Sequence, residues 1–422
     1  MANYKSDLMK TLTGRGFLYQ CTDEAALDTL AATSALSGYI GFDCTAPSLH
    51  VGSLVQIMML RILQKAGGKP IVLLGGGTTK IGDPSDKDKS RPILTSEKIE
   101  ENKNGIKRVF EKFLDFDGPN AAIMVDNADW LDKLGYIEFL RDIGKHFTIN
   151  RMVQLESVKR RLEREQPMTF LEFNYTLLQA YDFSELNRRY GCRLQLGGSD
   201  QWGNIVAGAD LTRRLESVEA YGFTTPLITT ASGGKMGKTA EGAMWLNADP
   251  SLGKDYFLSP YDYWQFWRNT EDADVGRFLR LFTDLPLEEI AALEALEGAE
   301  INTAKVRLAN ETTTLLHGAE AARTAEDTAN KTFAQGGSAA GLPTFELSQD
   351  ALSALTVTDA GVLSELCASK GEAKRHIKAG ALKINDEAVR DFTALLSTAD
   401  VNEDGVIKVS VGKKKHALLK PV

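Results

Sequence analysis

Cysteine is scarce in this sequence, and the few cysteines form no recognisable pattern. The 422 residues include four of them, with no C-x-x-C pair and no nearby histidine cluster: Cys21, Cys44, Cys192 and Cys367. Structural zinc sites and disulfide frameworks need regular spacings, so we expect neither. Widely separated thiols are typical of a reducing compartment.

Long apolar runs are also missing. The N-terminal stretch "MANYKSDLMKTLTGRGFLYQ" has neither a continuous apolar core nor a small-residue cleavage site. No other run approaches the ~18–20 apolar residues that a membrane-spanning helix requires. We therefore predict a cytoplasmic protein that does not interact with membranes.

Positive charge is in deficit over the whole chain. The sequence has 49 Lys and Arg against 57 Asp and Glu, a net charge of −8. A protein that coats nucleic acid indiscriminately needs clustered Lys and Arg, so this class is disfavoured and DNA is not an expected partner. Local basic surfaces remain: "KGEAKRHIKAGALKIN" (370–385) and "GKKKHALLK" (412–420) concentrate positive charge in the last fifth of the chain.

Apolar runs of strand character alternate with helix-period segments between about residues 36 and 230. The runs are "GYIGF", "KPIVLLGG", "AAIMVDN" and "CRLQLGG". This alternation predicts an α/β fold in which crossover helices join the strands of a Rossmann-like parallel sheet. In such a sheet the ligand binds beyond the carboxyl ends of the strands.

The rest of the chain divides by composition. Residues 255–333 are rich in helix formers, "AQGGSAAGLPTFELSQ" (334–349) has the composition of a flexible linker, and short helices and strands follow it. We predict four parts: a catalytic domain (1–245), a helical domain (246–333), the linker (334–349) and a small α+β C-terminal domain (350–422).

The stretch "CTAPSLHVGSL" (44–54) places polar side chains at the start of a helical run. Unpaired backbone N–H groups and the positive end of a helix dipole suit an anion there. The side chains able to donate hydrogen bonds to phosphate oxygens are Thr45, Ser48, His50 and Ser53. Gly52 would let a ribose approach the backbone. The alternative is that Ser48 caps the helix and His50 is a surface residue of its first turn.

Two glycine-containing loops carry further charged residues. In "GGKMGKTAEG" (233–242), Lys235 and Lys238 could close over a polyphosphate, although a solvated turn is the simpler interpretation. In "LLGGGTTKIGDPSDKDKSR" (73–91), Asp83 could meet a cationic amine, with Lys87 and Arg91 beyond it. A turn with ordinary surface charges is the alternative. The Walker pattern is absent, which excludes a P-loop NTPase.

A polar face is predicted on the helix "EFNYTLLQAYDFSEL" (172–186). Tyr175, Gln179 and Asp182 lie at i, i+4 and i+7, on one face. A buried Asp is costly unless a polar group satisfies it, and a ligand could be that group. An exposed polar stripe is the alternative.

The segment "LQLGGSDQWGNI" (194–205) reads as a strand with an inward Gln195, a Gly-Gly turn and a helix capped by Ser199 or Asp200. Asp200 could bind a ribose hydroxyl pair, because acidic residues at strand ends do so in dinucleotide folds.

In this order, these segments resemble class I aminoacyl-tRNA synthetases, and specifically bacterial-type tyrosyl-tRNA synthetases. "HVGS" is similar to the HIGH element and "KMGKT" to the KMSKS loop. More specific are "GYIGFDCTAPSLHVGSL", "KIGDPS", "YTLLQAYDF" and "LQLGGSDQWGNI", and the likeness covers essentially the whole chain. The C-terminal module is similar to the RNA-binding fold of a small-subunit ribosomal protein.

The resemblance implies an activity and its partners. Such enzymes activate L-tyrosine with ATP to tyrosyl-adenylate and pyrophosphate, then transfer tyrosine to the terminal adenosine of tRNA(Tyr). It implies Mg²⁺ held through the phosphates, no protein-bound metal, and a homodimer.

The resemblance also implies residue roles. Tyr39 and Asp182 would bind the phenol hydroxyl, and Asp83, Tyr175 and Gln179 the α-ammonium; Gln195 and Gln201 would complete the tyrosine pocket. Buried partners of a hydroxyl are left unpaired by phenylalanine, which gives discrimination.

On the ATP side, the resemblance places the following residues at the adenylate or its ribose: Asp43, Gly52, Gly198 and Asp200. Thr45 and His50 would hydrogen-bond the γ-phosphate, and four cations would neutralise the departing pyrophosphate: Lys87, Arg91, Lys235 and Lys238. Ser53 stands where the family has the second histidine of HIGH, so its ATP contact must be shorter or water-mediated. Ile40 stands where the family often has a cysteine beside the ribose.

Two alternatives stay open. A tryptophanyl-type synthetase, or another nucleotidyltransferase with an H-x-G-H-like element, is the nearer one, but an indole does not need the hydroxyl pair of Tyr39 and Asp182. The other is an RNA-binding factor that keeps a synthetase fold without activity. The presence of His50, Asp83 and the two loop lysines counts against it.

Overall fold

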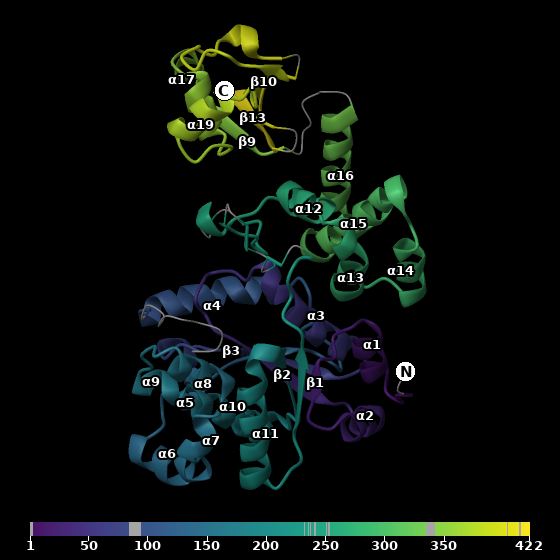
Figure 1. Ribbon diagram of the computed structural model, residues 1–422, viewed down its shortest axis with the longest axis vertical. Coiled ribbons are helices and arrows are strands. Elements are labelled where there is room, and N and C mark those ends of the chain that lie inside the picture. Colours follow the sequence, from purple (N-terminus) through teal and green to yellow (C-terminus); the bar gives the residue numbers. More distant parts are fainter. Residues whose placement is uncertain are drawn as a thin grey trace. The chain divides into compact units, whose positions relative to one another are not determined.

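The computed structural model describes residues 3–83, 94–231, 233–234, 236, 238–239, 242–249, 251, 254–334, 342–402, 404–412 and 415–422 (Figure 1). It contains two compact units. The first comprises Met1–Leu258 and Thr270–Leu308, and the second Ser259–Asn269 and Ala309–Val422. The four-part division of the sequence analysis remains a prediction.

A six-stranded sheet lies at the centre of the first unit. In spatial order its strands are β1 (Gln20–Cys21), β6 (Tyr221–Thr225), β5 (Leu194–Gly198), β2 (Ser37–Phe42), β3 (Lys69–Leu74) and β4 (Ile123–Asp126). All neighbours pair in parallel except β1, which is antiparallel to β6. The predicted Rossmann-like parallel sheet is confirmed, and the two strands at one of its edges, the parallel β6 and the short antiparallel β1, were not predicted from the sequence.

The chain leaves β2 toward β3 on one side, whereas β5 lies on its other side. The crevice between β2 and β5 is therefore the topological switch point of the sheet, where an open α/β fold binds its ligand. Tyr39 of β2 is paired with Gln195 of β5 across this crevice.

The helices that cover the sheet include α3 (Val51–Lys65), α4 (Ser96–Phe110), α10 (Tyr175–Tyr190) and α11 (Trp202–Glu216). Figure 1 shows α10 and α11 running side by side, and they make extensive contact. Helix α3 buries apolar residues almost all round, as a central helix does. Helix α10 ends at Gly191, which adopts the left-handed conformation (φ 64°) that glycine allows.

Short helices fill the connection from β4 to β5. They are α5 (Ala128–Leu131), α6 (Tyr136–Asp142), α7 (Ile149–Met152), α8 (Glu156–Glu163) and α9 (Phe170–Phe173). Several large apolar side chains of this connection are exposed: Tyr136, Ile137, Leu140, Ile149, Leu162, Phe170 and Leu171. Neither these helices nor this apolar surface was predicted from the sequence.

Other helices of the first unit are α1 (Asp7–Gly14), α2 (Glu24–Thr33), α13 (Asp272–Phe282) and α14 (Leu287–Glu294). Helix α12 (Pro260–Arg268) belongs to the second unit, as does α16 (Ala319–Ala334). Helix α15 (Ile301–His317) spans the division between the units. The stretch predicted to be helical, 255–333, is thus occupied by helices in the described structure.

A five-stranded sheet forms the core of the C-terminal part. Its order is β11 (Glu387–Ala388), β10 (Leu382–Ile384), β12 (Ile407–Val411), β13 (Lys415–Pro421) and β9 (Thr344–Leu347), with helices α17 (Gln349–Ser353), α18 (Val357–Leu363) and α19 (Lys370–Lys378). Strand β9 pairs in parallel with β13, although it falls in the predicted linker 334–349. Residues 335–341 of that linker lie outside the described structure. In the described part of the chain, every helix is too short or too polar to cross a membrane.

Candidate active site

A cavity of about 470 Å³ opens at the carboxyl ends of β2 and β5. It brings together twelve of the residues singled out in the sequence: Tyr39, Asp43, Thr45, His50, Ser53, Asp83, Tyr175, Gln179, Asp182, Gln195, Asp200 and Gln201. A second cavity of about 240 Å³, between α7 and α11, is lined by none of them. Residues as far apart in the sequence as Tyr39 and Gln201 thus converge at the switch point.

The deepest acid of the cavity is Asp182 of α10, whose exposed fraction is 1%. Its Oδ1 accepts a hydrogen bond from Trp130 Nε1 at 2.7 Å, and its Oδ2 accepts one from Asn127 Nδ2 at 3.0 Å. Burial raises the pKa of Asp182 to about 7; the two hydrogen bonds oppose this rise, and the charges of Asp43 and Glu185 add to it. The carboxyl group therefore changes charge near neutral pH.

Tyr39 shares this end of the cavity and is fully buried. Its hydroxyl oxygen has no hydrogen-bond partner among the described residues. Burial, together with the charge of Asp182, raises the pKa of Tyr39 well above its usual value, so the hydroxyl keeps its proton. A buried hydroxyl without a partner is costly, and a ligand with its own hydroxyl would satisfy it.

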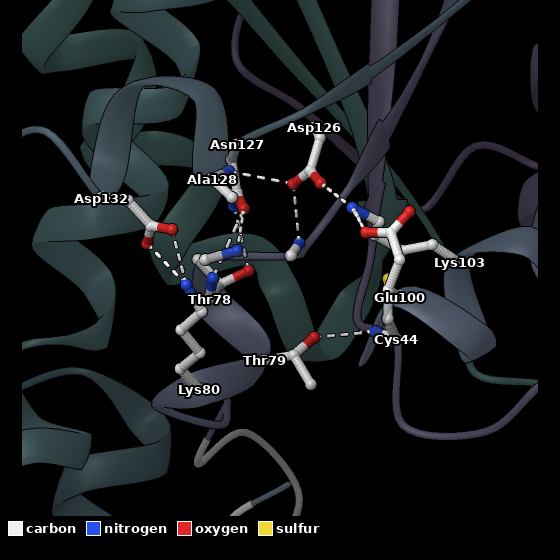
Figure 2. Close-up of polar contacts among 12 residues, drawn as sticks. Cys44, Thr78, Thr79, Lys80, Glu100, Lys103, Asp126, Asn127, Ala128 and Asp132 are labelled. Carbon is white, nitrogen blue, oxygen red and sulfur yellow. Dashed lines mark hydrogen bonds and ion pairs between the residues drawn. The ribbon is translucent and has the colours of Figure 1, made fainter. Parts of the chain in front are cut away.

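Asn127 and Trp130 were missed by the sequence analysis. Both follow β4: Asn127 ends the run "AAIMVDN", which had been predicted as a strand, and Trp130 lies three residues further on. Asn127 Oδ1 also accepts from the backbone N–H of Gly77 at 2.8 Å, and its Nδ2 donates to Thr78 Oγ1 at 3.0 Å (Figure 2). The available signal was a polar residue at a strand's carboxyl end, the same signal that indicated Asp200.

Asp126 fixes the backbone around Asn127. Its Oδ1 accepts from the N–H groups of Gly76 at 3.1 Å and Ala128 at 2.9 Å, and its Oδ2 pairs with Lys103 of α4 (Figure 2). A Cβ on Gly76 would lie 2.3 Å from Asp126 Oδ1, so only glycine fits. The loop after β3 is thereby fastened to the loop after β4.

Three polar residues of the cavity are joined by hydrogen bonds. Gln201 Nε2 donates to Asp83 Oδ2 at 2.8 Å, and Gln179 Nε2 donates to Gln201 Oε1 at 3.3 Å. A carboxylate beside two amide side chains has the donor and acceptor groups to hold an ammonium. Tyr175, the first residue of α10, is buried beside them.

His50 is the N-cap of α3, where its Nδ1 accepts from the N–H of Gly52 at 3.0 Å. The alternative in which Ser48 caps this helix is wrong, because the Ser48 hydroxyl donates to the Leu49 carbonyl instead. A neutral imidazole whose Nδ1 accepts carries its proton on Nε2, so Nε2 is a donor.

Two predicted glycines do not line the cavity, although their neighbours do. A Cβ on Gly52 would lie 2.6 Å from His50 Cε1, so this glycine makes room for the histidine. Gly198 is the N-cap of a 3-10 helix, η3 (Ser199–Gln201), which has no side-chain cap. The predicted capping by Ser199 or Asp200 is therefore wrong. Gln195 is buried as predicted, and its Oε1 has no partner among the described residues.

The sequence matches two protein families, one after the other, over residues 31–419. Residues 31–334 match the family described as tRNA synthetases class I (W and Y), and residues 334–419 match the Tyrosine--tRNA ligase SYY-like C-terminal domain. The chain belongs to the class I tRNA synthetases.

Relatives of this synthetase resemble it over their full length. The Tyrosine--tRNA ligase of Caulobacter vibrioides is 60% identical over 427 residues, which cover 100% of this chain and 99% of that protein. The one from Rhodospirillum rubrum is 59% identical over 418 residues, covering 99% and 98%. A C-terminally truncated mitochondrial tyrosyl-tRNA synthetase of Aspergillus nidulans, 28% identical, has a similar structure with a TM-score of 0.69 over 78% of this chain and 95% of that chain. The resemblance noted in the sequence is confirmed.

Four cations that the resemblance assigned to the pyrophosphate are the least described part of this synthetase. Lys87, Arg91 and Lys235 lie outside the described residues. Lys238 begins the short strand β7 (Lys238–Thr239), but its side chain is not described. Within the described ranges, His, Cys, Asp and Glu side chains form no group of three that could hold a metal ion.

Proposed function

We propose that this chain is a tyrosine--tRNA ligase, which forms tyrosyl-adenylate from L-tyrosine and ATP and then charges tRNA(Tyr). The observation that carries the proposal is that one buried cavity holds both the Tyr39 hydroxyl, which has no hydrogen-bond partner among the described residues, and the Asp182 carboxyl, whose charge acts on it. A phenol hydroxyl entering there gives Tyr39 its missing partner and donates to Asp182. Phenylalanine brings no hydroxyl, so it leaves the buried Tyr39 hydroxyl without a partner, and the larger indole of tryptophan has no hydroxyl to place between Tyr39 and Asp182; both differences penalise binding.

The tyrosine would lie along the cavity with its ammonium at the opposite end. Asp83 supplies the negative charge, and Gln179 and Tyr175 supply the remaining acceptors. Gln201 orients Asp83 through the hydrogen bond at 2.8 Å, and Gln195 closes the side of the cavity.

The first step needs no covalent intermediate on the protein. The tyrosine carboxylate attacks the α-phosphate of ATP in line and pyrophosphate leaves, so the protein supplies position and charge stabilisation. His50 donates from Nε2, with Thr45 and Ser53 beside it, while Asp43 and Asp200 receive the ribose. ATP enters as its magnesium complex, with the metal held by phosphate oxygens. The proposed neutralising cations are Lys87, Arg91, Lys235 and Lys238.

The second step brings the terminal hydroxyl of tRNA to the adenylate. The C-terminal sheet carries helix α19, whose cations are suited to an RNA backbone: Lys370, Lys374, Arg375 and Lys378. We also propose a homodimer, because the exposed apolar side chains of 136–171 form the kind of surface that a second copy would cover. Protein synthesis would place the enzyme in the cytoplasm, and the four cysteines are unpaired, as a reducing compartment requires.

Amino-acid-dependent exchange of pyrophosphate into ATP tests the proposal. Tyrosine should support exchange, and phenylalanine and tryptophan should not. Tyr39→Phe, which removes one hydroxyl, should raise KM for tyrosine with little change for ATP. Tyr263→Phe is the matched control, because Tyr263 is also fully buried but lies in α12 and outside the cavity. Exchange with tryptophan, or tRNA binding without exchange, would reject the proposal.

A further inference from the structure

Asp182 is held by Trp130, and Trp130 is itself held by a charged side chain from the helix that carries Asp182. The guanidinium carbon of Arg189 lies 5.0 Å from the centroid of the Trp130 ring. This is the distance range of a cation–π contact, which is strongest for tryptophan. The indole is nearly buried, so its Nε1 is aimed at Asp182 by what touches its ring.

Arg189 is in turn anchored by Glu185. Its Nε donates to Glu185 Oε2 at 2.8 Å, one helical turn back on α10. The Glu185 side chain is only 5% exposed, whereas that of Arg189 is 42% exposed. Glu185 also accepts from Tyr181 Oη at 2.8 Å and pairs with Arg188. Burial by itself would raise the pKa of Glu185, but these hydrogen bonds and the two arginine charges lower it, so Glu185 remains charged.

The spacing on α10 explains why these residues act together. Asp182, Glu185 and Arg189 occupy positions i, i+3 and i+7, which lie on one face of a helix. Trp130 approaches this face from α5, a helix of only four residues that has little rigidity of its own. A long side chain that extends from α10 over the indole therefore connects the two elements.

We propose that Arg189, anchored on Glu185, is a positioning residue that keeps the Trp130 indole directed at Asp182 and so sets how tightly the pocket binds the substrate hydroxyl. The inference rests on the proposed tyrosine-activating function. It assigns no contact with substrate to Arg189 or Glu185, neither of which lines the cavity.

The charge of Glu185 raises the pKa of Asp182, and Arg189, which compensates Glu185, should oppose this effect. The titratable groups that face Asp182 are Tyr39 on β2, Asp43 after β2 and Glu185 on its own helix. Tyr39 stays protonated near neutral pH because its pKa is raised. Without the cation of Arg189, the negative charge of Glu185 is less compensated, which disfavours the ionised form of Asp182. Without the anion of Glu185, the ionised form of Asp182 is favoured.

The test compares Arg189→Met, Glu185→Gln and Arg189→Lys in the full-length protein, with tyrosine-dependent exchange measured from pH 5.5 to 8.5. Arg189→Met should raise KM for tyrosine by roughly threefold to tenfold, with KM for ATP nearly unchanged. It should also move the pH midpoint of tyrosine KM upward, whereas Glu185→Gln should move it downward. Arg189→Lys, which keeps the charge without the flat guanidinium, should recover the midpoint and part of the affinity.

Arg160→Met is the matched control, because Arg160 makes an i, i+4 ion pair with Glu156 on α8 and is not in the cavity. The inference would be overturned if Arg189→Met changed the KM for tyrosine and the KM for ATP equally, or if Arg189→Met and Glu185→Gln had the same pH midpoint. In both cases the wild-type protein would still activate tyrosine. If Arg189→Met does not fold, Glu185→Gln decides by a downward shift of its midpoint, and Arg189→Lys by a wild-type midpoint with a raised KM for tyrosine. A wild-type protein without tyrosine-dependent exchange would instead refute the function on which the inference rests.

Discussion

Trp130 Nε1 lies 2.7 Å from Asp182 Oδ1, and the indole is one of two groups, both just after β4 in the chain, that donate hydrogen bonds to this carboxyl group. Each carboxylate oxygen can accept two hydrogen bonds, and the protein supplies one to each. The acid is therefore oriented but keeps acceptor capacity for an incoming hydroxyl. Orientation by neutral donors adds no charge that would compete with the substrate.

Asp182→Asn should remove most of the affinity for tyrosine. The amide group has the size of the carboxyl group, but its nitrogen must face either Trp130 Nε1 or Asn127 Nδ2, which are both donors. We expect tyrosine binding to weaken roughly tenfold to hundredfold, the value of hydrogen bonds to a charged group. Isothermal titration with tyrosine and with phenylalanine measures the change. Tyrosine affinity equal to wild type would show that this helix face is not the hydroxyl site.

Tyrosine affinity should depend on pH with a midpoint near the pKa of Asp182, about 7. The ionised carboxylate accepts the phenol hydrogen, so affinity should be highest above pH 7 and fall about tenfold per unit below it. Titrations from pH 5.5 to 8.5 measure the slope, and Asp182→Asn should abolish it. A wild-type profile that is flat across pH 7 would contradict the assignment.

The unliganded protein should show the opposite trend in stability. The folded pKa of Asp182 lies above its ordinary value of 3.8, so the folded state binds the proton more tightly than the unfolded state. The contribution of this group to the free energy of unfolding is therefore largest at low pH and is lost as pH rises toward 7. Comparing wild type with Asp182→Asn isolates this contribution.

The sequence was sufficient to predict the site residues that lie on long helices and strands. Helix α10 has sixteen residues, and its period placed Tyr175, Gln179 and Asp182 on one face that the cavity shares. The strands β2 and β5 were recognisable as the apolar runs "GYIGF" and "CRLQLGG". These signals are local, and tertiary contacts did not overturn them.

The sequence was insufficient to predict the site residues whose positions depend on contacts between loops that are distant in the chain. Helix α5 is too short for a hydrophobic period, so Trp130 carried no signal until β4 was seen beside β3. The capping of η3 was predicted from residue type alone, but the chain enters the 3-10 helix from Gly198, and the Asp200 carboxylate accepts from Gln201 instead. His50 was expected inside the helix or near it, and its role as N-cap became clear only from the bond to Gly52.

His50 combines a structural role with a proposed phosphate contact, and two variants separate them. His50→Ala loses the cap and should lower the free energy of unfolding by about 0.5–2 kcal/mol. His50→Asn keeps an N-cap acceptor and should retain nearly wild-type stability. Both lack the Nε2 donor, so both should slow tyrosine activation. Chemical denaturation measures the first role and pyrophosphate exchange the second. Full activity in His50→Asn would show that the imidazole serves only as an N-cap.

Arg15 should be important for stability without taking part in the reaction. It is 9% exposed, and its guanidinium donates to three carbonyl oxygens near the end of α13: those of Arg280 at 2.9 Å, Thr283 at 2.8 Å and Leu285 at 2.5 Å. Arg15→Met keeps the apolar stem but leaves these acceptors unpaired, which should cost about 2–4 kcal/mol in denaturant unfolding. Lys10→Ala, which removes an exposed i, i+3 pair of α1, is the control and should cost about 0.5 kcal/mol or less. Equal losses in the two variants would contradict this account.

Removing the C-terminal sheet should separate the two steps of the reaction. The cavity is lined only by residues between Tyr39 and Trp245, so a chain ending at Ala334 should form tyrosyl-adenylate at the wild-type rate. The chain should be shortened after Ala334 and not at 350. A cut at 350 would leave β9 without its partner β13 and would expose Leu347, which packs in the core of the C-terminal part. Charging of tRNA should require at least about tenfold more tRNA and depend less on salt, since the cations of α19 are lost. Exchange and charging assays at two salt concentrations measure this, and equal charging by the shortened chain would show that the C-terminal sheet does not hold the tRNA.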